Sequence, residues 1–236
     1  MASEKASLHQ VPFPAIGVVY FGLYLAYLFY SLEGELMHWI GLVAVPALIT
    51  AATLRYGGRP ARPRDVLRCF GLVRGNLTSG LRLAVVVGLI LGAAQLYFSR
   101  YAADFVDLST SGRVLYMFPL AFILMLATAG FTEEFFFRGF LQNRLEQLTS
   151  SRVAGVILGS LAFGVYHLPY AYLNPRWPSA GDWGAAWSAA MGQGVVGGLI
   201  LGTVYLVARR NLLAPAIVHA LINALPATTL IKFGGG

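Results

Sequence analysis

The sequence predicts an all-α, polytopic membrane protein with about seven transmembrane helices and a polar site inside the membrane. Only 11% of the 236 residues are charged, against about 25% in an ordinary soluble domain. Apolar residues make up 57% of the chain, and the mean hydropathy is +0.67. Seven stretches approach the roughly 20 apolar residues that a helix needs to cross a bilayer.

The composition also argues against several other classes of protein. A disordered chain would need low hydrophobicity and high charge. The shortage of polar residues disfavours a soluble enzyme, and it disfavours a nucleic-acid-binding protein despite the net charge of +7. The single cysteine, Cys69, excludes an intramolecular disulfide framework.

The apolar stretches follow one another through a single domain that covers residues 1–236. We expect the fifth helix to end at His167, because Pro169 disfavours helical geometry at the residue before it. Glycines recur every four residues in the sixth stretch, at Gly194, Gly198 and Gly202, a pattern that lets helices pack closely. The predicted spans are Phe13–Tyr30, Leu36–Leu54, Leu81–Phe98, Val114–Phe131 with an extension, Val153–His167, Ala185–Ala208 and Leu212–Ile231.

Arginine residues set the expected orientation in the membrane. They concentrate between the second and third spans and after the fourth and sixth spans. By the positive-inside rule, these segments and the N-terminus lie in the cytoplasm. The bias of 15 arginines to 2 lysines favours a bacterial source and therefore an inner-membrane location. The segment richest in arginine, which could also rest on anionic lipid, carries Arg55, Arg59, Arg62, Arg64, Arg68 and Arg74.

Five ionisable residues fall within or at the edge of apolar stretches. A charged side chain near the centre of a bilayer costs about 2.5–3.5 kcal/mol, so such residues are candidates for a functional site. The alternative is that they mark helix ends and extend to the interface. We assign that interfacial position, without chemistry, to His38, which lies beside Trp39 near the end of the second span. The five candidates are Glu133, Glu134, Arg138, His167 and His219.

Spacing assigns different roles to the two adjacent glutamates. Glu134 and Arg138 are four residues apart, so they share one helical face within ion-pairing reach. Glu133 points about 100° away from Glu134 around the helix. The arginine can therefore neutralise Glu134 and leave Glu133 free to accept a proton from water.

Two further pairs have the same spacing of four residues. Phe163 and His167 share one helical face, and so do His219 and Asn223. An imidazole beside a carboxamide offers two hydrogen-bond donors at one point, which suits stabilisation of an oxyanion. Polar pairs also bond across helices for packing alone. The presence of Glu133 and His167 favours the catalytic interpretation.

The depths of these residues require a particular arrangement of the spans. Glu133 and His219 fall toward the cytoplasmic side, whereas His167 lies about 21 Å into the fifth span at 1.5 Å per residue. Residues of one site must lie at similar depth. The fifth span must therefore start outside the membrane, tilt, or follow a long cytoplasmic extension of the fourth span.

Three motifs together resemble the signature of the CAAX protease and bacteriocin-processing family, also called CPBP or Abi. Each motif is weak alone, but their order and their positions on the spans make a specific signal. The resemblance covers about residues 118–225. The motifs read Glu133-Glu134-x-x-x-Arg138, Phe163-x-x-x-His167 and His219-x-x-x-Asn223.

The resemblance implies a multi-helix intramembrane endopeptidase of glutamate type, similar to enzymes that trim prenylated CAAX proteins. Glu133 with His167 would bind and activate the attacking water. His219 with Asn223 would stabilise the tetrahedral oxyanion. The implied supporting residues are Glu134, Arg138 and Phe163.

The expected partners are the lipid bilayer and a membrane-associated protein or peptide. This substrate would be cleaved near a lipid-modified or transmembrane end, and no nucleic-acid partner is expected. A bacterial source would make prenylation itself unexpected.

Three alternatives stay open at this point. A non-catalytic member of the family, in bacteriocin immunity or as a scaffold, would carry the same motifs. A proton-coupled transporter is less favoured, because no inverted half of the chain matches the glutamate pair. The resemblance favours a protease without a metal cofactor, but zinc takes carboxylate and imidazole ligands. In a zinc protease the ligands would be Glu133, Glu134, His167 and His219.

Overall fold

A computed structural model describes residues 11–32, 34–72 and 77–231, and every regular element in these ranges is a helix. The predicted all-α class is therefore confirmed. The predicted cytoplasmic N-terminus, at residues 1–10, and Arg74 lie outside the described residues.

The N-terminal half contains a short apolar helix, a long continuous helix and a pair of helices joined at a bend. The long helix covers Glu35–Tyr56, and the two helices of the pair, α6 and α7, meet at a bend of 112°. The elements are α2 (Ala15–Tyr30), α3 (Glu35–Trp39), the π-helical η1 (Ile40–Ala44), α4 (Val45–Tyr56), α5 (Pro63–Cys69), α6 (Leu81–Tyr97) and α7 (Ala102–Thr110).

The C-terminal half begins with a continuous helical run, Val114–Thr149, of 36 residues. Its parts are α8 (Val114–Met125), the π-helical η3 (Leu126–Gly130), α9 (Phe131–Glu134), the π-helical η4 (Phe135–Gln142) and α10 (Asn143–Thr149). The remaining elements are α11 (Arg152–Leu173), α12 (Trp183–Ala189), the π-helical η5 (Ala190–Val195), α13 (Val196–Val207), α14 (Leu213–Ala227) and the 3-10 helix η6 (Thr228–Leu230).

Each predicted span corresponds to a helix, but the count of seven full spans is not confirmed. In the described residues, five helices are long and apolar enough to cross a membrane, or up to six if the bent α6–α7 pair is one span. The first predicted span, α2, has 16 residues and is short for a full crossing. The long apolar helices define an integral membrane protein.

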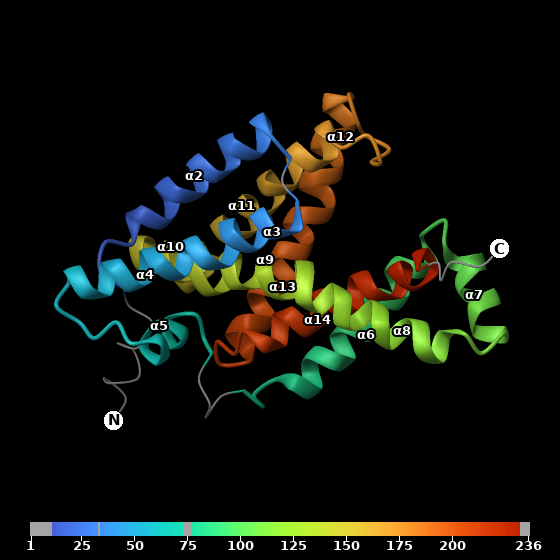
Figure 1. The fold of residues 1–236 in the computed structure, drawn as a ribbon, viewed down its shortest axis with the longest axis horizontal. Coiled ribbons are helices and arrows are strands. Elements are labelled where there is room, and N and C mark those ends of the chain that lie inside the picture. Colours follow the sequence, from blue (N-terminus) through green and yellow to red (C-terminus); the bar gives the residue numbers. More distant parts are fainter. Residues whose placement is uncertain (1–10, 33, 73–76, 232–236) are drawn as a thin grey trace.

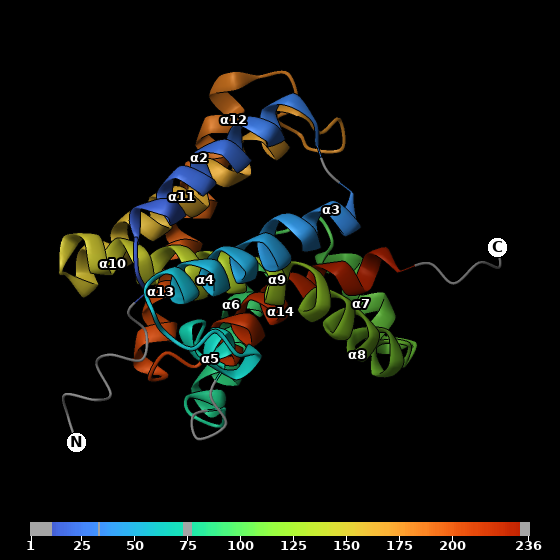
Figure 2. The same ribbon diagram turned by 60° about the vertical axis from the view of Figure 1, so that its left-hand side comes forward.

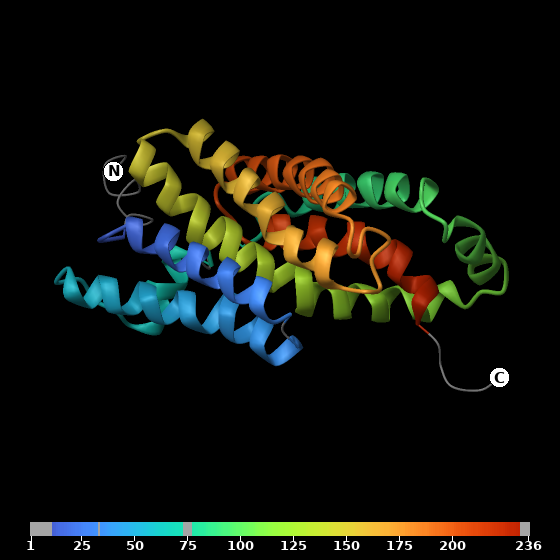
Figure 3. The ribbon, with the colours of Figure 1, turned by 90° about the horizontal axis from the view of Figure 1, so that it is seen from above.

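The helices form two groups around the long run (Figure 1). α14 packs mainly against α6 and α8, whereas α11 packs against η5, α13 and α10. Figure 3 shows the run from α8 to α10 extending along the molecule, with α11 returning beside it. In Figure 2, α2 lies along α11, and it covers the outer side of the pair formed by α10 and α11.

A tight turn at Ser150 and Ser151 reverses the chain between α10 and α11. Ser150 has a left-handed backbone, with φ of 53°, and the Ser151 side chain caps α11 by accepting a hydrogen bond from the Ala154 amide. Glu133 lies about as many turns before this reversal as His167 lies after it. The two residues are therefore level, and the helical run Val114–Thr149 extends well beyond the predicted end of the fourth span at Phe131.

Glycines bring α11 close to η5 and α13, as the predicted small-residue pattern requires. A Cβ added at Gly194 would lie 2.7 Å from the Cα of Gly164, and one added at Gly198 would lie 2.8 Å from the Cα of Ser160. This close backbone approach places the sixth predicted span beside His167.

The predicted end of the fifth helix at His167 is wrong, because α11 continues through Pro169 to Leu173. Proline has a backbone φ compatible with a helix, but it forfeits a hydrogen bond to the preceding turn and its ring crowds the carbonyl group there. Packing compensates here: Leu168 and Ala171 are buried against Ala186 and Ala190 of the neighbouring helix.

Candidate active site

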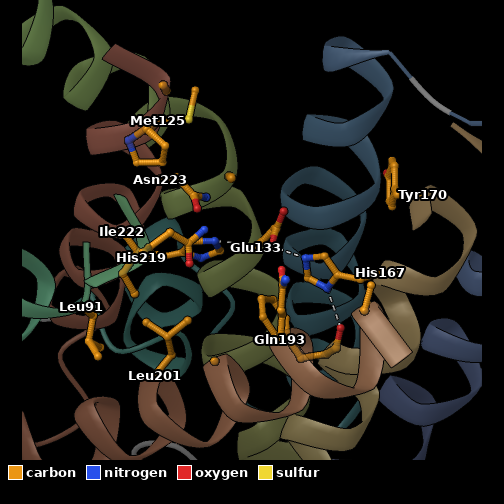
Figure 4. A pocket seen from close by; sticks show the side chains of 18 of the residues that line it. Leu91, Met125, Glu133, His167, Tyr170, Gln193, Leu201, His219, Ile222 and Asn223 are labelled. Carbon is orange, nitrogen blue, oxygen red and sulfur yellow. Dashed lines mark hydrogen bonds and ion pairs between the residues drawn. The ribbon is translucent and has the colours of Figure 1, made fainter. Parts of the chain in front are cut away.

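A cavity of about 1080 Å³ lies between the two groups of helices and is lined by several of the predicted site residues (Figure 4). Its wall is formed by residues of α3, α6, α8, α9, α11, η5, α13 and α14. Five predicted site residues line it: Glu133, Phe163, His167, His219 and Asn223.

Glu133 occupies the centre of this group. Its Oε2 atom lies 3.9 Å from Nε2 of His167 and 3.9 Å from Nε2 of His219. The side chain is buried, and among the described residues Oε2 has no hydrogen-bond partner. A buried carboxylate oxygen without a donor is rare, which marks the position as a site for an additional ligand.

Two side chains bind the Glu134 carboxylate: Arg138, which is cationic, and His219, which is cationic when protonated. Arg138 contacts both of its oxygens, with Nη1 at 3.1 Å from Oε1 and Nε at 3.0 Å from Oε2. Nδ1 of His219 lies 2.9 Å from Oε1. Arg138 also donates through Nη2 to the carbonyl oxygen of Gly198 at 3.2 Å, which ties α13 to the site. The predicted Glu134–Arg138 pair is thus present, and Glu133 is outside it.

The hydrogen bonds of the two histidines determine where their protons lie. Nδ1 of His167 is 2.7 Å from the carbonyl oxygen of Phe163, which can only accept, so Nδ1 carries hydrogen. In neutral His167, Nε2 is then an acceptor that faces Glu133. Nδ1 of His219 faces the Glu134 carboxylate and likewise carries hydrogen.

Phe163 packs among the ionic groups instead of binding them through hydrogen bonds. Its ring meets His167 edge to face at 4.6 Å, and it meets His219 in the same way at 5.9 Å. The guanidinium carbon of Arg138 lies 4.5 Å from its ring centre. This ring fixes the rotation of both imidazoles and shields the Glu134–Arg138 pair from the cavity.

Asn223 lies one turn after His219 on α14 and lines the same cavity (Figure 4). Its carboxamide is half-buried, and His219 is buried. The two side chains enter the cavity from one helix, opposite α11, so a carbonyl group near Glu133 could meet donors from both.

The residues do not fit the four-ligand zinc site that the sequence left open. Both Glu134 oxygens are engaged by Arg138, and one also faces His219. The 3.9 Å separations around Glu133 exceed the spacing of about 3.3 Å between tetrahedral ligands at zinc bond lengths. Among the described residues, no group of three or more His, Cys, Asp or Glu side chains could hold a metal ion.

Sequence reasoning missed Gln193, whose side chain reaches into the cavity beside His167 (Figure 4). Gln193 lies in η5, a π-helical stretch, and such irregular turns are frequent at functional sites. The signal in the sequence was an isolated carboxamide within an apolar, glycine-rich span.

The structure gives His38 a contact with the site that the sequence did not predict. This residue also lines the cavity, and its Nε2 lies 2.9 Å from Oγ1 of Thr132. Trp39 stacks on Phe131 with ring centres 5.8 Å apart, which brings α3 onto α9. This tertiary contact, which no local pattern encodes, turns His38 inward.

The fold and this cavity define a helical membrane protein with buried carboxylate and imidazole groups. Residues 115–225, just under half of the chain, match the family described as type II CAAX prenyl endopeptidase Rce1-like. This match confirms the resemblance to CAAX proteases that the three motifs indicate. No curated protein and no solved structure matches the chain.

Proposed function

We propose that this protein is an intramembrane endopeptidase of glutamate type. It cleaves a peptide bond near the lipid-modified or transmembrane end of a membrane-associated protein or peptide. The observation that carries the proposal is Oε2 of Glu133, which finds no hydrogen-bond partner in the described part of the chain and has an imidazole Nε2 at 3.9 Å on either side. The family match supports peptidase activity in general.

The proposed attacking water binds between Glu133 and His167. Both facing atoms are acceptors, and a water about 2.8 Å from each would direct its two hydrogens to them at roughly 90°. Such a water is oriented with its lone pairs toward the cavity, where the scissile carbonyl would lie. Glu133 acts as the general base.

In the proposed reaction, Glu133 accepts one proton and later returns it. The water oxygen bonds to the carbonyl carbon, Glu133 takes a proton, and the carbonyl oxygen becomes an oxyanion. The oxyanion accepts hydrogen bonds from Nε2 of His219 and from the Asn223 amide. Glu133 then returns the proton to the departing nitrogen as the carbon–nitrogen bond breaks, which releases an acid and an amine.

Charge balance supports a protonated His219 in this role. Glu133 and Glu134 carry two negative charges, and Arg138 supplies one positive charge beside them. A second positive charge on His219 makes the buried group neutral overall, which lowers its cost in a low-dielectric medium. The cation donates through Nδ1 to Glu134 and keeps Nε2–H for the oxyanion.

The proposed mechanism uses no metal, and its setting follows from the predicted topology. We place the arginine-rich segments on the cytoplasmic side of a bacterial inner membrane. The substrate is then a membrane protein or peptide precursor of that cell, without nucleic acid as a partner.

Comparative proteomics of membrane and secreted fractions tests this function. A strain with Glu133→Ala should accumulate a precursor that a wild-type strain processes. Asp104→Ala, which removes an exposed carboxylate on α7 away from the cavity, is the matched control and should process normally. If no precursor accumulates while wild-type and Glu133→Ala proteins confer the same immunity phenotype, a non-catalytic role replaces this one.

A further inference from the structure

His38 connects the two helices that carry the proposed water-binding pair. It lies on α3, outside the matched residues 115–225. Its Nε2 is 2.9 Å from Oγ1 of Thr132, and its Nδ1 is 3.4 Å from Oη of Tyr166. Thr132 directly precedes Glu133, and Tyr166 directly precedes His167.

The hydrogen inventory of these groups gives each contact a direction. The Thr132 hydroxyl donates its only hydrogen to the carbonyl oxygen of Thr128 in the preceding turn. Thr132 must therefore accept from His38, so Nε2 of His38 carries hydrogen. Nδ1 of a neutral ring is then an acceptor, so the hydroxyl of Tyr166 is the donor in their 3.4 Å contact, and this hydroxyl has Tyr170 as a second hydrogen-bond partner.

The helix that carries Glu133 is short, so contacts from other segments are needed to fix the position of this side chain. Glu133 belongs to α9, which spans only Phe131–Glu134, with the π-helical η3 before it and η4 after it. Helical register changes at both junctions, so the direction of the Glu133 side chain is not fixed by local hydrogen bonds alone.

Tyr166 provides the same support on the other helix. Its ring is buried, lies 5.1 Å from the ring of His167, and packs at 5.0 Å from Phe137. A hydrogen bond from its hydroxyl to His38 thus restrains the turn of α11 that carries His167.

We propose that His38 is a positioning residue that sets the separation between Glu133 and His167 by bonding to Thr132 and Tyr166. This inference rests on the proposed function, because the separation matters only if the pair shares a water. His38 acts through its neighbours and touches no reacting atom. Its loss should therefore lower kcat and leave KM unchanged.

A variant series on purified protein in detergent tests the inference. His38→Ala should lower kcat about tenfold, the usual effect of losing one such hydrogen bond. His38→Gln can still donate from the Nε2 position to Thr132 and should recover most of the activity. Met37→Ala, an exposed neighbour on the same helix, is the control and should match wild type.

A double-mutant cycle isolates the contact from general damage to the fold. Thr132→Val removes the acceptor with little change in side-chain shape and should lower kcat. Combining it with His38→Ala should cause no loss beyond that of His38→Ala alone, because the His38–Thr132 hydrogen bond is already absent in that variant. If His38→Ala does not fold, His38→Gln and Thr132→Val still measure the contact.

The outcomes separate this inference from the proposed function. If wild type and Glu133→Ala are equally inactive or equally active, the proposed function fails. If activity depends on Glu133 but His38→Ala and Thr132→Val keep wild-type kcat, the positioning role alone is wrong. A rise in KM at constant kcat, or additive losses in the cycle, would also contradict it.

Discussion

Oε2 of Glu133 lies 3.9 Å from Nε2 of His167. When His167 is neutral, both of these atoms are hydrogen-bond acceptors. The other ring nitrogen of His167, Nδ1, donates a hydrogen bond to the carbonyl oxygen of Phe163, 2.7 Å away. Two facing acceptors at this distance need a donor between them, and one water supplies both hydrogens. In the proposed mechanism, this pairing links the geometry of α9 and α11 to hydrolysis.

Removal of the His167 imidazole should therefore lower turnover strongly. We expect His167→Ala to lower kcat by at least about a hundredfold, because the water loses one of its two acceptors. Tyr172→Phe, which changes a hydroxyl on the same helix away from the cavity, is the control. Single-turnover cleavage by purified protein measures the effect, and equal rates for the two variants would contradict it.

The Glu134–Arg138 pair should matter for stability as well as for the site. Arg138→Ala leaves the fully buried Glu134 without its main partner, so we expect a loss of about 3–5 kcal/mol in the free energy of unfolding. Arg152→Ala removes an exposed arginine 3.8 Å from Glu146 and should cost less than about 1 kcal/mol. Denaturation by SDS in mixed micelles gives both values. Similar losses in the two variants would show that the buried pair is not a structural unit.

Close packing of η5 on α11 should tolerate no added methyl group at Gly194. The new Cβ would lie 2.7 Å from the Cα of Gly164, so a backbone would have to move. We expect Gly194→Ala to destabilise the protein by about 1–3 kcal/mol and to lower turnover, since His167 lies beside this contact. Gly22→Ala, where the methyl group meets no described atom within 4 Å, should do neither.

Cys69 should be unreactive in the folded protein at neutral pH. It lies on α5, outside the candidate spans, and burial raises the pKa of its thiol. Because the thiolate is the reactive form, alkylation should be slow at neutral pH and should accelerate only above the pH at which an ordinary thiol ionises. Mass spectrometry after iodoacetamide treatment, with and without SDS, measures this. Rapid labelling of the folded protein at pH 7 would show that the thiol is exposed.

Much of this arrangement could be predicted because its causes are local. Helices follow from long apolar stretches, and the Glu134–Arg138 pair follows from a spacing of four residues, which survived the change to π-helical geometry at Phe135. The spacing of His219 and Asn223 likewise placed both side chains on one cavity.

The features that sequence reasoning missed depend on contacts between distant segments. His38 turns inward because Trp39 stacks on Phe131, and α11 continues through Pro169 because its last turns are buried against α12. The level position of Glu133 and His167 depends on the tight turn at Ser150.

Cleavage of a purified substrate by Glu133→Gln protein tests the central claim most directly. The substitution preserves the shape of the side chain but removes the base, and a tight metal chelator is added in a parallel reaction. If Glu133 is the general base of a metal-free peptidase, turnover by Glu133→Gln falls by at least about a hundredfold while its thermal unfolding is preserved. The chelator then leaves wild-type turnover unchanged. Wild-type turnover by Glu133→Gln, or loss of wild-type activity on chelation, would contradict this mechanism.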